Sequence, residues 1–206
     1  MAPTYTPLGS RSSAAIVALY VAVGASLLAV GADVRRIVVA QRLEDGRVLV
    51  DALLGADQLV TLASRLEIIA FVVAAALFLR WQAGTRRNRC ALGETSSGIA
   101  VWFVAVVNLV AFLAIVAASL FLGDAADVAE LQRIDGLRAA AAALAALAAS
   151  LAITVVSRTT SRQEARAVAI GSPRAAPRTE ARDQGVPEGG LRVVTEEQAR
   201  RSRRDP

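Results

Sequence analysis

The sequence contains no histidine, no lysine and only one cysteine, Cys90. Without histidine there is no imidazole for acid–base catalysis, and a lone cysteine forms neither a Cys/His zinc cluster nor an internal disulfide. Aromatic residues make up only 4% of the chain. Because these absences remove most familiar catalytic chemistry, we expect a protein that is not an enzyme and that needs no cofactor or metal.

Apolar residues dominate what is present. The chain has 206 residues, of which 55% are hydrophobic and 20% charged, and its mean hydropathy of +0.48 is too high for an ordinary soluble domain. All 23 basic residues are arginine, against 18 acidic residues. Because this bias accompanies a high alanine content, we attribute it to composition and do not expect a nucleic-acid partner.

Four apolar runs are long enough to cross a bilayer core of about 30 Å as helices. They cover residues 13–32, 59–81, 98–122 and 138–157. The first run, which follows Arg11, also resembles a secretory signal peptide, but it is longer than the usual apolar region of about 7–15 residues. The sequence therefore predicts an all-α integral membrane bundle of four transmembrane helices, with the lipid bilayer as its first partner.

The predicted bundle, residues 13–157, is flanked by two segments of different composition. Residues 1–12 form a short N-terminal flank, and residues 158–206 are rich in Arg, Glu, Pro and Gly, which predicts a disordered basic tail. Three arginines near the start of this tail are four residues apart: Arg158, Arg162 and Arg166. A helical continuation of the fourth run would place them on one face, toward anionic headgroups.

Residues 33–64, between the first two runs, mix charged and apolar side chains. Apolar residues recur there at helical spacing: Leu49, Leu53, Ala56 and Val60. This pattern predicts an amphipathic segment, either a helix lying in the membrane interface or, as we prefer, a solvated cap packed on the bundle. Gly46 and Gly55 are expected to interrupt it.

The polar and small residues of the runs predict how the helices pack. Asn108 is the only strongly polar side chain near mid-membrane, and we expect its amide to hydrogen-bond to a neighbouring helix. The fourth run is dominated by alanine, so its small-residue face should be covered by other helices. Its heptad-spaced leucines, Leu137, Leu144 and Leu151, leave a soluble coiled coil as the weaker alternative. The first run carries a small-residue ridge that fits packing within the chain or a homo-oligomer: Ala14, Ala18, Ala22 and Ser26.

Four carboxylates follow the third run: Asp124, Asp127, Glu130 and Asp135. Their spacing lacks the alternating ligands and the turn glycine of an EF-hand loop. We therefore expect a solvated acidic loop and assign no metal.

Arginines near the ends of the runs bear on orientation, because cytoplasmic flanks carry an excess of them. With both termini inside, the inner flanks hold nine arginines and the outer flanks seven. The inner set includes the basic loop after the second run, whereas Arg35 and Arg36 argue for the opposite orientation. We expect a multi-pass protein of the cell membrane with both termini cytoplasmic.

Two segments carry a resemblance to a known family. Trp81 ends an apolar helix, and Asn88 follows seven residues later in a basic loop. A Trp102-Phe103 pair comes next, with Asn108 six positions after that tryptophan. This pattern resembles the domain of unknown function 4328, a bacterial family of multi-span membrane proteins, and the resemblance implies that architecture without an activity. The chain departs from the family at one position where arginine is usual and two where proline is usual: Gly84, Ala105 and Phe112.

These features favour a non-enzymatic integral membrane protein, a scaffold or interaction protein that acts through a basic cytoplasmic face. Six arginines are candidates to contact anionic lipid headgroups or an acidic protein partner: Arg86, Arg87, Arg89, Arg158, Arg162 and Arg166. The alternative is a component of a transporter or channel complex, which we rank second because we expect no ionisable group in the membrane interior. An intramembrane enzyme ranks lowest, since Ser26, Ser119 and Ser150 have no histidine or lysine as a base.

Overall fold

The computed structural model describes residues 5–47, 49–94, 98–121 and 127–171, and within them it contains four α-helices and no strand. The helices are α1 (Gly9–Glu44), α2 (Val50–Ala91), α3 (Ile99–Phe121) and α4 (Val128–Ala169). Each contains a stretch with the length and hydropathy of a membrane span. The all-α, four-span prediction is therefore confirmed for this part of the chain.

The lengths of the helices indicate where the bilayer lies. α3 has 23 residues, and at 1.5 Å per residue its length of about 35 Å matches a hydrocarbon core of about 30 Å. α1 has 36 residues, and α2 and α4 have 42 each. These three helices are too long for one crossing, so they extend beyond the bilayer, and the predicted spans are only their central parts.

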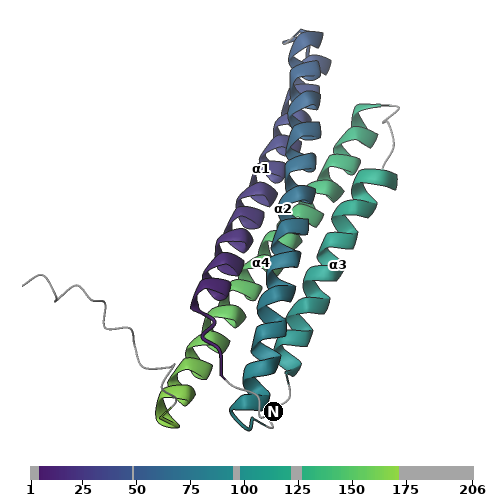
Figure 1. Cartoon of the computed structure of the whole chain (residues 1–206). Helices are drawn as coiled ribbons and strands as arrows, with labels where there is room; N and C mark the ends of the chain where they lie inside the picture. The colour runs from purple at the N-terminus through teal and green to yellow at the C-terminus, as the bar shows by residue number, and fades with distance from the viewer. Residues whose placement is uncertain (1–4, 48, 95–97, 122–126, 172–206) are drawn as a thin grey trace, which may run out of the picture.

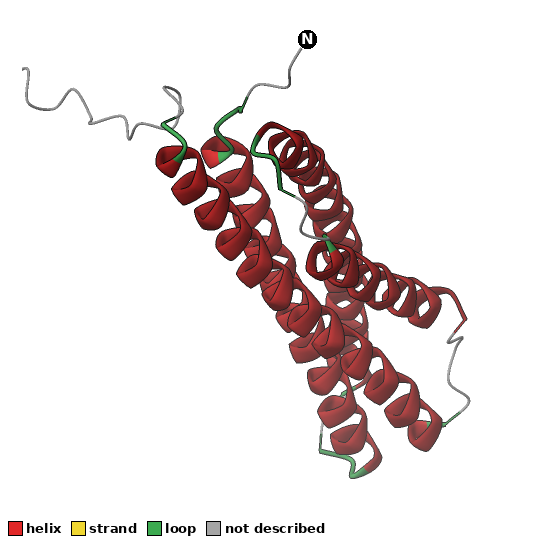
Figure 2. Cartoon of the chain, turned by 90° about the horizontal axis from the view of Figure 1, so that it is seen from below, coloured by secondary structure: helices red, strands yellow, loops and turns green. Residues whose placement is uncertain are grey.

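The helices run side by side as an elongated bundle (Figure 1, Figure 2). α1 packs along both α2 and α4, while α3 packs chiefly on α4 and makes few contacts with α2. α1 and α4 are therefore the inner pair of helices, and α3 lies at the outside of the bundle. Eight large apolar side chains of α3 are more than half exposed, as expected for contact with lipid: Ile99, Trp102, Phe103, Val106, Leu109, Val110, Leu113 and Leu120.

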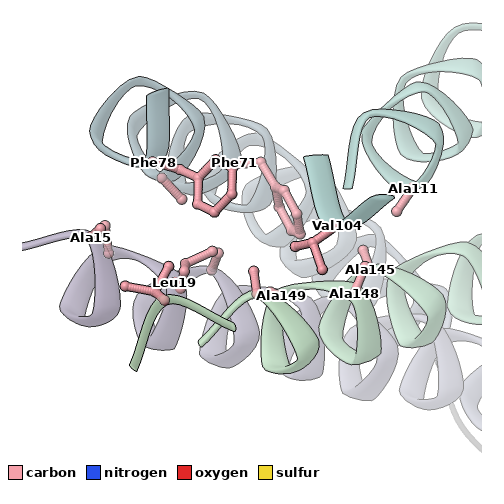
Figure 3. Close-up of a cluster of buried hydrophobic side chains, with 14 of the residues drawn as sticks. Ala15, Leu19, Phe71, Phe78, Val104, Ala111, Ala145, Ala148 and Ala149 are labelled. Carbon is pink, nitrogen blue, oxygen red and sulfur yellow. The ribbon is translucent and has the colours of Figure 1, made fainter. Parts of the chain in front are cut away.

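Alanine forms most of the core, together with a few larger side chains (Figure 3). Six alanines of the predicted fourth span are buried in α4: Ala142, Ala145, Ala146, Ala148, Ala149 and Ala152. The expectation that neighbouring helices cover this face is confirmed. Leu137, Leu144 and Leu151 are instead 40–51% exposed, so they face lipid and do not form the buried seam that a coiled coil requires.

The small-residue ridge of α1 packs inside the chain. Ala18, Ala22 and Ser26 are buried as expected, whereas Ala14 is exposed and Ala15 takes its place. The buried face continues through Ala29 and Ala32 and then beyond the predicted span: Asp33, Arg36 and Ala40. A single helical face therefore runs from the lipid-embedded part of α1 into the part that leaves the bilayer.

The predicted amphipathic segment, residues 33–64, is divided between the end of α1 and the start of α2. These two helix ends form a hairpin that reaches beyond the neighbouring end of α3 (Figure 1). Gly46, with φ of 69°, lies in the turn, as expected for a residue that tolerates this conformation. The expected break at Gly55 is wrong, because Gly55 lies inside α2, where packing of the adjacent Ala56 and of Val60 offsets the low helix propensity of glycine.

The predicted boundary at residue 157 is also corrected. α4 continues to Ala169, so residues 158–169 are helical rather than part of a disordered tail. Residues 172–206 of that predicted tail, and Asp124 of the predicted acidic loop, lie outside the described residues. Asp127 caps α4 by accepting a hydrogen bond from the Glu130 amide at 2.7 Å.

Candidate functional site

Arginine is concentrated at one end of the bundle, where α1 begins and α2 and α4 end (Figure 1). Eight arginines belong to this region: Arg11, Arg80, Arg86, Arg87, Arg89, Arg158, Arg162 and Arg166. Two carboxylates accompany them in the described residues, Glu94 and Glu164. We call these ten residues the basic end, and their net formal charge is +6.

All six arginines predicted to contact anionic lipid lie at the basic end. Arg86, Arg87 and the three arginines of α4 are exposed, and Arg89 is half-buried. Because residues 158–169 are helical, the four-residue spacing of Arg158, Arg162 and Arg166 places them on one face. Arg166 also contacts Glu94 at 3.4 Å, so one of the two carboxylates is already engaged.

Arg86 connects the basic end to the start of α3. Its guanidinium carbon lies 4.9 Å from the ring centroid of Trp102, a cation–π contact. Trp102 is 56% exposed, and an indole at this position suits the boundary between hydrocarbon and headgroups. Arg86 therefore contacts Trp102, one of the residues that carry the family resemblance, and Phe103 beside it is exposed.

Buried hydrogen bonds join α2 to α4 at the same end. Trp81 Nε1 donates to Thr160 Oγ1 at 3.1 Å, and Gln163 Nε2 donates to the Thr85 carbonyl at 3.3 Å. Trp81 is fully buried and packs against Phe78, with ring centroids 5.4 Å apart. These contacts hold the two arginine-bearing helices in a fixed relation.

Asn88 ties the N-terminal flank to α2. Its side chain accepts from the Thr6 amide at 3.0 Å and donates to the Thr6 carbonyl at 2.7 Å. Leu8 packs so closely on Gly84 that a Cβ there would lie 2.7 Å from Leu8 Cδ2. The glycine found where the resembling family has arginine therefore makes room for this flank.

Tyr5 completes the anchoring of the flank. It is buried with Leu92 and Ala167, which belong to the ends of α2 and α4. Burial raises the pKa of the Tyr5 phenol above its ordinary value of 10.0, and the nearby Glu164 carboxylate raises it further. The flank is thus an ordered part of the basic end from Tyr5 onward.

Asn108 makes the interhelical contact expected from the sequence. Its Nδ2 donates to the Ala148 carbonyl of α4 at 3.0 Å and to the Val104 carbonyl of its own helix at 2.9 Å. The prediction that this amide binds a neighbouring helix is confirmed. Since both contacts are to backbone carbonyls, Asn108 fixes the packing of α3 on α4.

A second polar region lies toward the other end of the bundle and was not predicted. Six ionisable residues from α1, α2 and α4 form it: Asp33, Arg36, Asp57, Glu67, Asp135 and Arg138. We call them the ionisable cluster. Asp33, Glu67 and Asp135 are at most 3% exposed and Arg36 is 9% exposed, so ionisable side chains are buried inside the bundle at the edges of the predicted spans.

Arg36 forms ion pairs with two carboxylates of this cluster. Its Nε and Nη2 donate to the two carboxylate oxygens of Asp135 at 2.8 and 2.6 Å. Its Nη1 donates to Asp57, whose side chain is largely exposed. A single guanidinium therefore joins α1, α4 and α2, in the two-point geometry that arginine favours with carboxylates.

Glu67 and Asp33 belong to a small cavity beside this ion pair. The cavity is lined by all four helices, including Ser64 of α2, Ser119 of α3 and Arg138 of α4. Glu67 Oε1 and the nearby Ser26 Oγ are buried and have no hydrogen-bond partner in the described part of the chain. The cavity therefore contains polar atoms that packing alone leaves unsatisfied.

The cluster was missed because its residues lie at the edges of the predicted spans. Charges at a span edge resemble a loop, and the sequence pattern does not show that α1, α2 and α4 continue as helices there. One signal was available: Asp33 and Arg36 extend the three- and four-residue spacing of Ala22, Ser26 and Ala29, which marks a single helical face.

The cluster does not contain a conventional metal site. No group of three metal-ligating side chains of the His, Cys, Asp or Glu type occurs within the ranges that the structure describes. The acids of the predicted acidic loop have separate positions: Asp127 caps α4 and Asp135 is bound by Arg36.

No family model, curated protein or solved structure matches this chain. The resemblance to the domain of unknown function 4328 therefore stays a prediction.

Proposed function

We propose that the protein is a non-enzymatic membrane interaction protein whose basic end lies at the cytoplasmic face and binds anionic lipid headgroups. The observation that carries this proposal is the gathering of eight arginines and two carboxylates at one end of the bundle. Arginine binds phosphate in a two-point geometry, and each basic residue near an anionic surface contributes about 1 kcal/mol of attraction. An acidic protein partner would use the same residues.

The charge at the opposite end supports this orientation. Among the described residues outside the central parts of the helices, that end has six arginines: Arg35, Arg36, Arg42, Arg47, Arg133 and Arg138. It has eight carboxylates: Asp33, Glu44, Asp45, Asp51, Asp57, Asp127, Glu130 and Asp135. Its net charge is −2, against +6 for the basic end, and the excess of arginine favours the cytoplasmic side for the latter.

The arrangement of the basic end also suits a flat anionic surface. Arg158, Arg162 and Arg166 follow one another at about 6 Å intervals along α4. The hydrogen bonds of Trp81 and Gln163 fix α4 against α2. Because the arginines are held on ordered helices, little backbone entropy is lost when they bind a lipid surface.

A component of a transporter or channel complex is the second candidate, and one observation favours it. The cavity at Glu67 is lined by residues of all four helices and contains buried carboxylates, a feature that is expensive in a membrane protein and often functional. We rank this candidate second because the cavity is small and lies near the end of α3.

The proposal is tested by the lipids that the purified full-length protein retains. The variant Arg158→Gln/Arg162→Gln/Arg166→Gln removes three charges from the basic end, and Arg35→Gln/Arg42→Gln/Arg47→Gln removes three exposed charges from the opposite end. Native mass spectrometry after exchange into equal amounts of phosphatidylglycerol and phosphatidylcholine measures the preference. We expect the first variant alone to lose most of the preference for phosphatidylglycerol.

Two results would contradict the proposal. Equal retention of both lipids by the unmodified protein would exclude selective binding of anionic lipid, and an equal loss in both variants would show that the basic end has no special role. Correct folding of each variant is checked by circular dichroism.

A further inference from the structure

We infer that Glu67 is a proton-binding site, at which a neutral carboxyl group donates its hydrogen to Ser26 Oγ. The site lies between α1 and α2 and is separate from the basic end. It goes beyond the proposed function, because lipid binding at the opposite end of the bundle does not depend on it.

First, the side chains of Glu67 and Ser26 are buried next to each other with incomplete hydrogen bonding. Glu67 is 3% exposed and Ser26 is fully buried. The Ser26 hydroxyl lies beside the Glu67 carboxyl group, yet neither Ser26 Oγ nor Glu67 Oε1 completes a hydrogen bond with any described residue. A proton on Oε1 turns this oxygen into a donor and Ser26 Oγ into its acceptor, so one added hydrogen satisfies both atoms.

The second argument is the absence of a counter-charge. Among the described residues no ion pair includes Glu67. Arg36 is already bound by Asp135 and Asp57, and Arg138 Nε donates to the Ala118 carbonyl at 3.4 Å. An ionised carboxylate that is buried without a counter-charge is destabilising, and the group relieves this cost by binding a proton.

The described groups around Glu67 come from all four helices and include one positive charge. α1 contributes Ser26 and Asp33, α2 contributes Ser64, and α3 contributes Ser119. These groups are hydroxyls and a second carboxylate, and only Arg138 of α4 brings positive charge to the cavity. Hydroxyls can donate to a carboxylate or accept from a neutral acid, but they do not supply the counter-charge that a buried carboxylate lacks.

The third argument is the size of the cavity, about 10 Å³. That is room for roughly one water molecule, which is too little to hydrate a carboxylate or to hold a hydrated cation. A proton needs no further ligands. The site is close to the aqueous phase, because Ser119 lies two residues before the end of α3, about 3 Å along the helix axis.

Protonation of Glu67 therefore makes the contact between α1 and α2 depend on pH. When the proton leaves for water, a buried negative charge remains with the Ser26 hydroxyl as its nearest donor, and we expect the contact between α1 and α2 to open and admit water. The Glu67→Gln variant keeps the shape of the neutral acid and cannot ionise.

The experiment is infrared spectroscopy of the full-length protein in phosphatidylcholine liposomes at neutral pH. We expect a carbonyl stretching band of a protonated carboxylic acid, which disappears in Glu67→Gln and persists in Asp51→Asn, a change at an exposed carboxylate. Ser26→Ala should keep the band and move it to higher frequency, because the hydrogen bond is lost. This second variant tests the site even if Glu67→Gln fails to fold.

Three results would overturn the proposal. The band is absent from the unmodified protein and stability depends on sodium ions, which would identify a bound cation. The band survives Glu67→Gln and disappears in Asp33→Asn, which would place the proton on the neighbouring acid. The band has the same frequency in Ser26→Ala, which would exclude the hydrogen bond to Ser26.

Discussion

Arg36 and Asp135 are 99 positions apart in the chain and form a two-point ion pair inside the bundle, with Asp135 fully buried. This pair joins α1 to α4 at the point where both extend beyond the end of α3. Removing two charges from water is costly, so a pair of this kind serves stability only while both partners and their hydrogen bonds are present.

Replacing Arg36 alone should therefore be strongly destabilising. Arg36→Met leaves Asp135 buried without a partner, and we expect the free energy of unfolding to fall by about 3–5 kcal/mol. The measurement is reversible unfolding of the purified protein in mixed micelles, followed by circular dichroism. Arg42→Gln, an exposed change on the same helix, should alter the value by less than about 0.5 kcal/mol.

The double variant Arg36→Met/Asp135→Leu tests whether Arg36→Met is destabilising because Asp135 loses its charged partner or because packing is lost. Because no buried charge is left on α4, we expect it to be considerably more stable than Arg36→Met. If the double variant loses the sum of the two single losses, Arg36 and Asp135 do not act as a pair.

The sequence predicts the parts of this fold that depend on local composition. Four apolar runs mark the helices because a span is defined by its own residues, and the alanines of residues 138–157 mark a covered face for the same reason. Asn108 was predictable because a single amide inside an apolar run must find a backbone partner. Such features need no knowledge of which helices are neighbours.

The ion pair and the cavity required that knowledge. Arg36, Asp57 and Asp135 come from three helices, and the sequence around each residue does not indicate which residues it contacts. The helices also continue beyond the spans because α1, α2 and α4 pack on one another, so charges that resembled loop residues became core residues. The same packing keeps Gly55 inside α2 despite the low helix propensity of glycine.

Loss of the Asn108 hydrogen bond should have a small effect. Asn108→Leu removes the donor to the Ala148 carbonyl, and interhelical hydrogen bonds in membranes average about 0.6 kcal/mol with a maximum of about 1.7 kcal/mol. We expect a loss in this range by the same unfolding measurement. Val110→Leu, on the exposed side of α3, serves as the control and should cause no measurable change. A loss several times larger than the maximum would assign Asn108 a role beyond packing α3 on α4.

The orientation of the bundle predicts which thiols are accessible from outside the cell. Cys90 is exposed at the basic end, so an impermeant thiol reagent should leave the unmodified protein unlabelled in intact cells and label it after permeabilisation. Asp51→Cys in a Cys90→Ser background places the only cysteine at the start of α2, at the opposite end, and should be labelled in intact cells. Labelling of Cys90 without permeabilisation would invert the proposed topology.

Alkaline pH should loosen the N-terminal flank through Tyr5. Burial raises the pKa of this phenol above its ordinary value of 10.0, so the native state binds the proton more tightly than the unfolded state. The contribution of Tyr5 to stability is therefore complete below that ordinary value and is lost as pH rises through the higher native value. In a Tyr20→Phe background, which leaves Tyr5 as the single tyrosine of the chain, absorbance of the phenolate should appear at higher pH in the folded than in the unfolded protein. Tyr5→Phe should remove this part of the pH dependence of unfolding. A phenolate that appears at the same pH in both states would show that Tyr5 is hydrated and that the flank is not packed against Leu92 and Ala167.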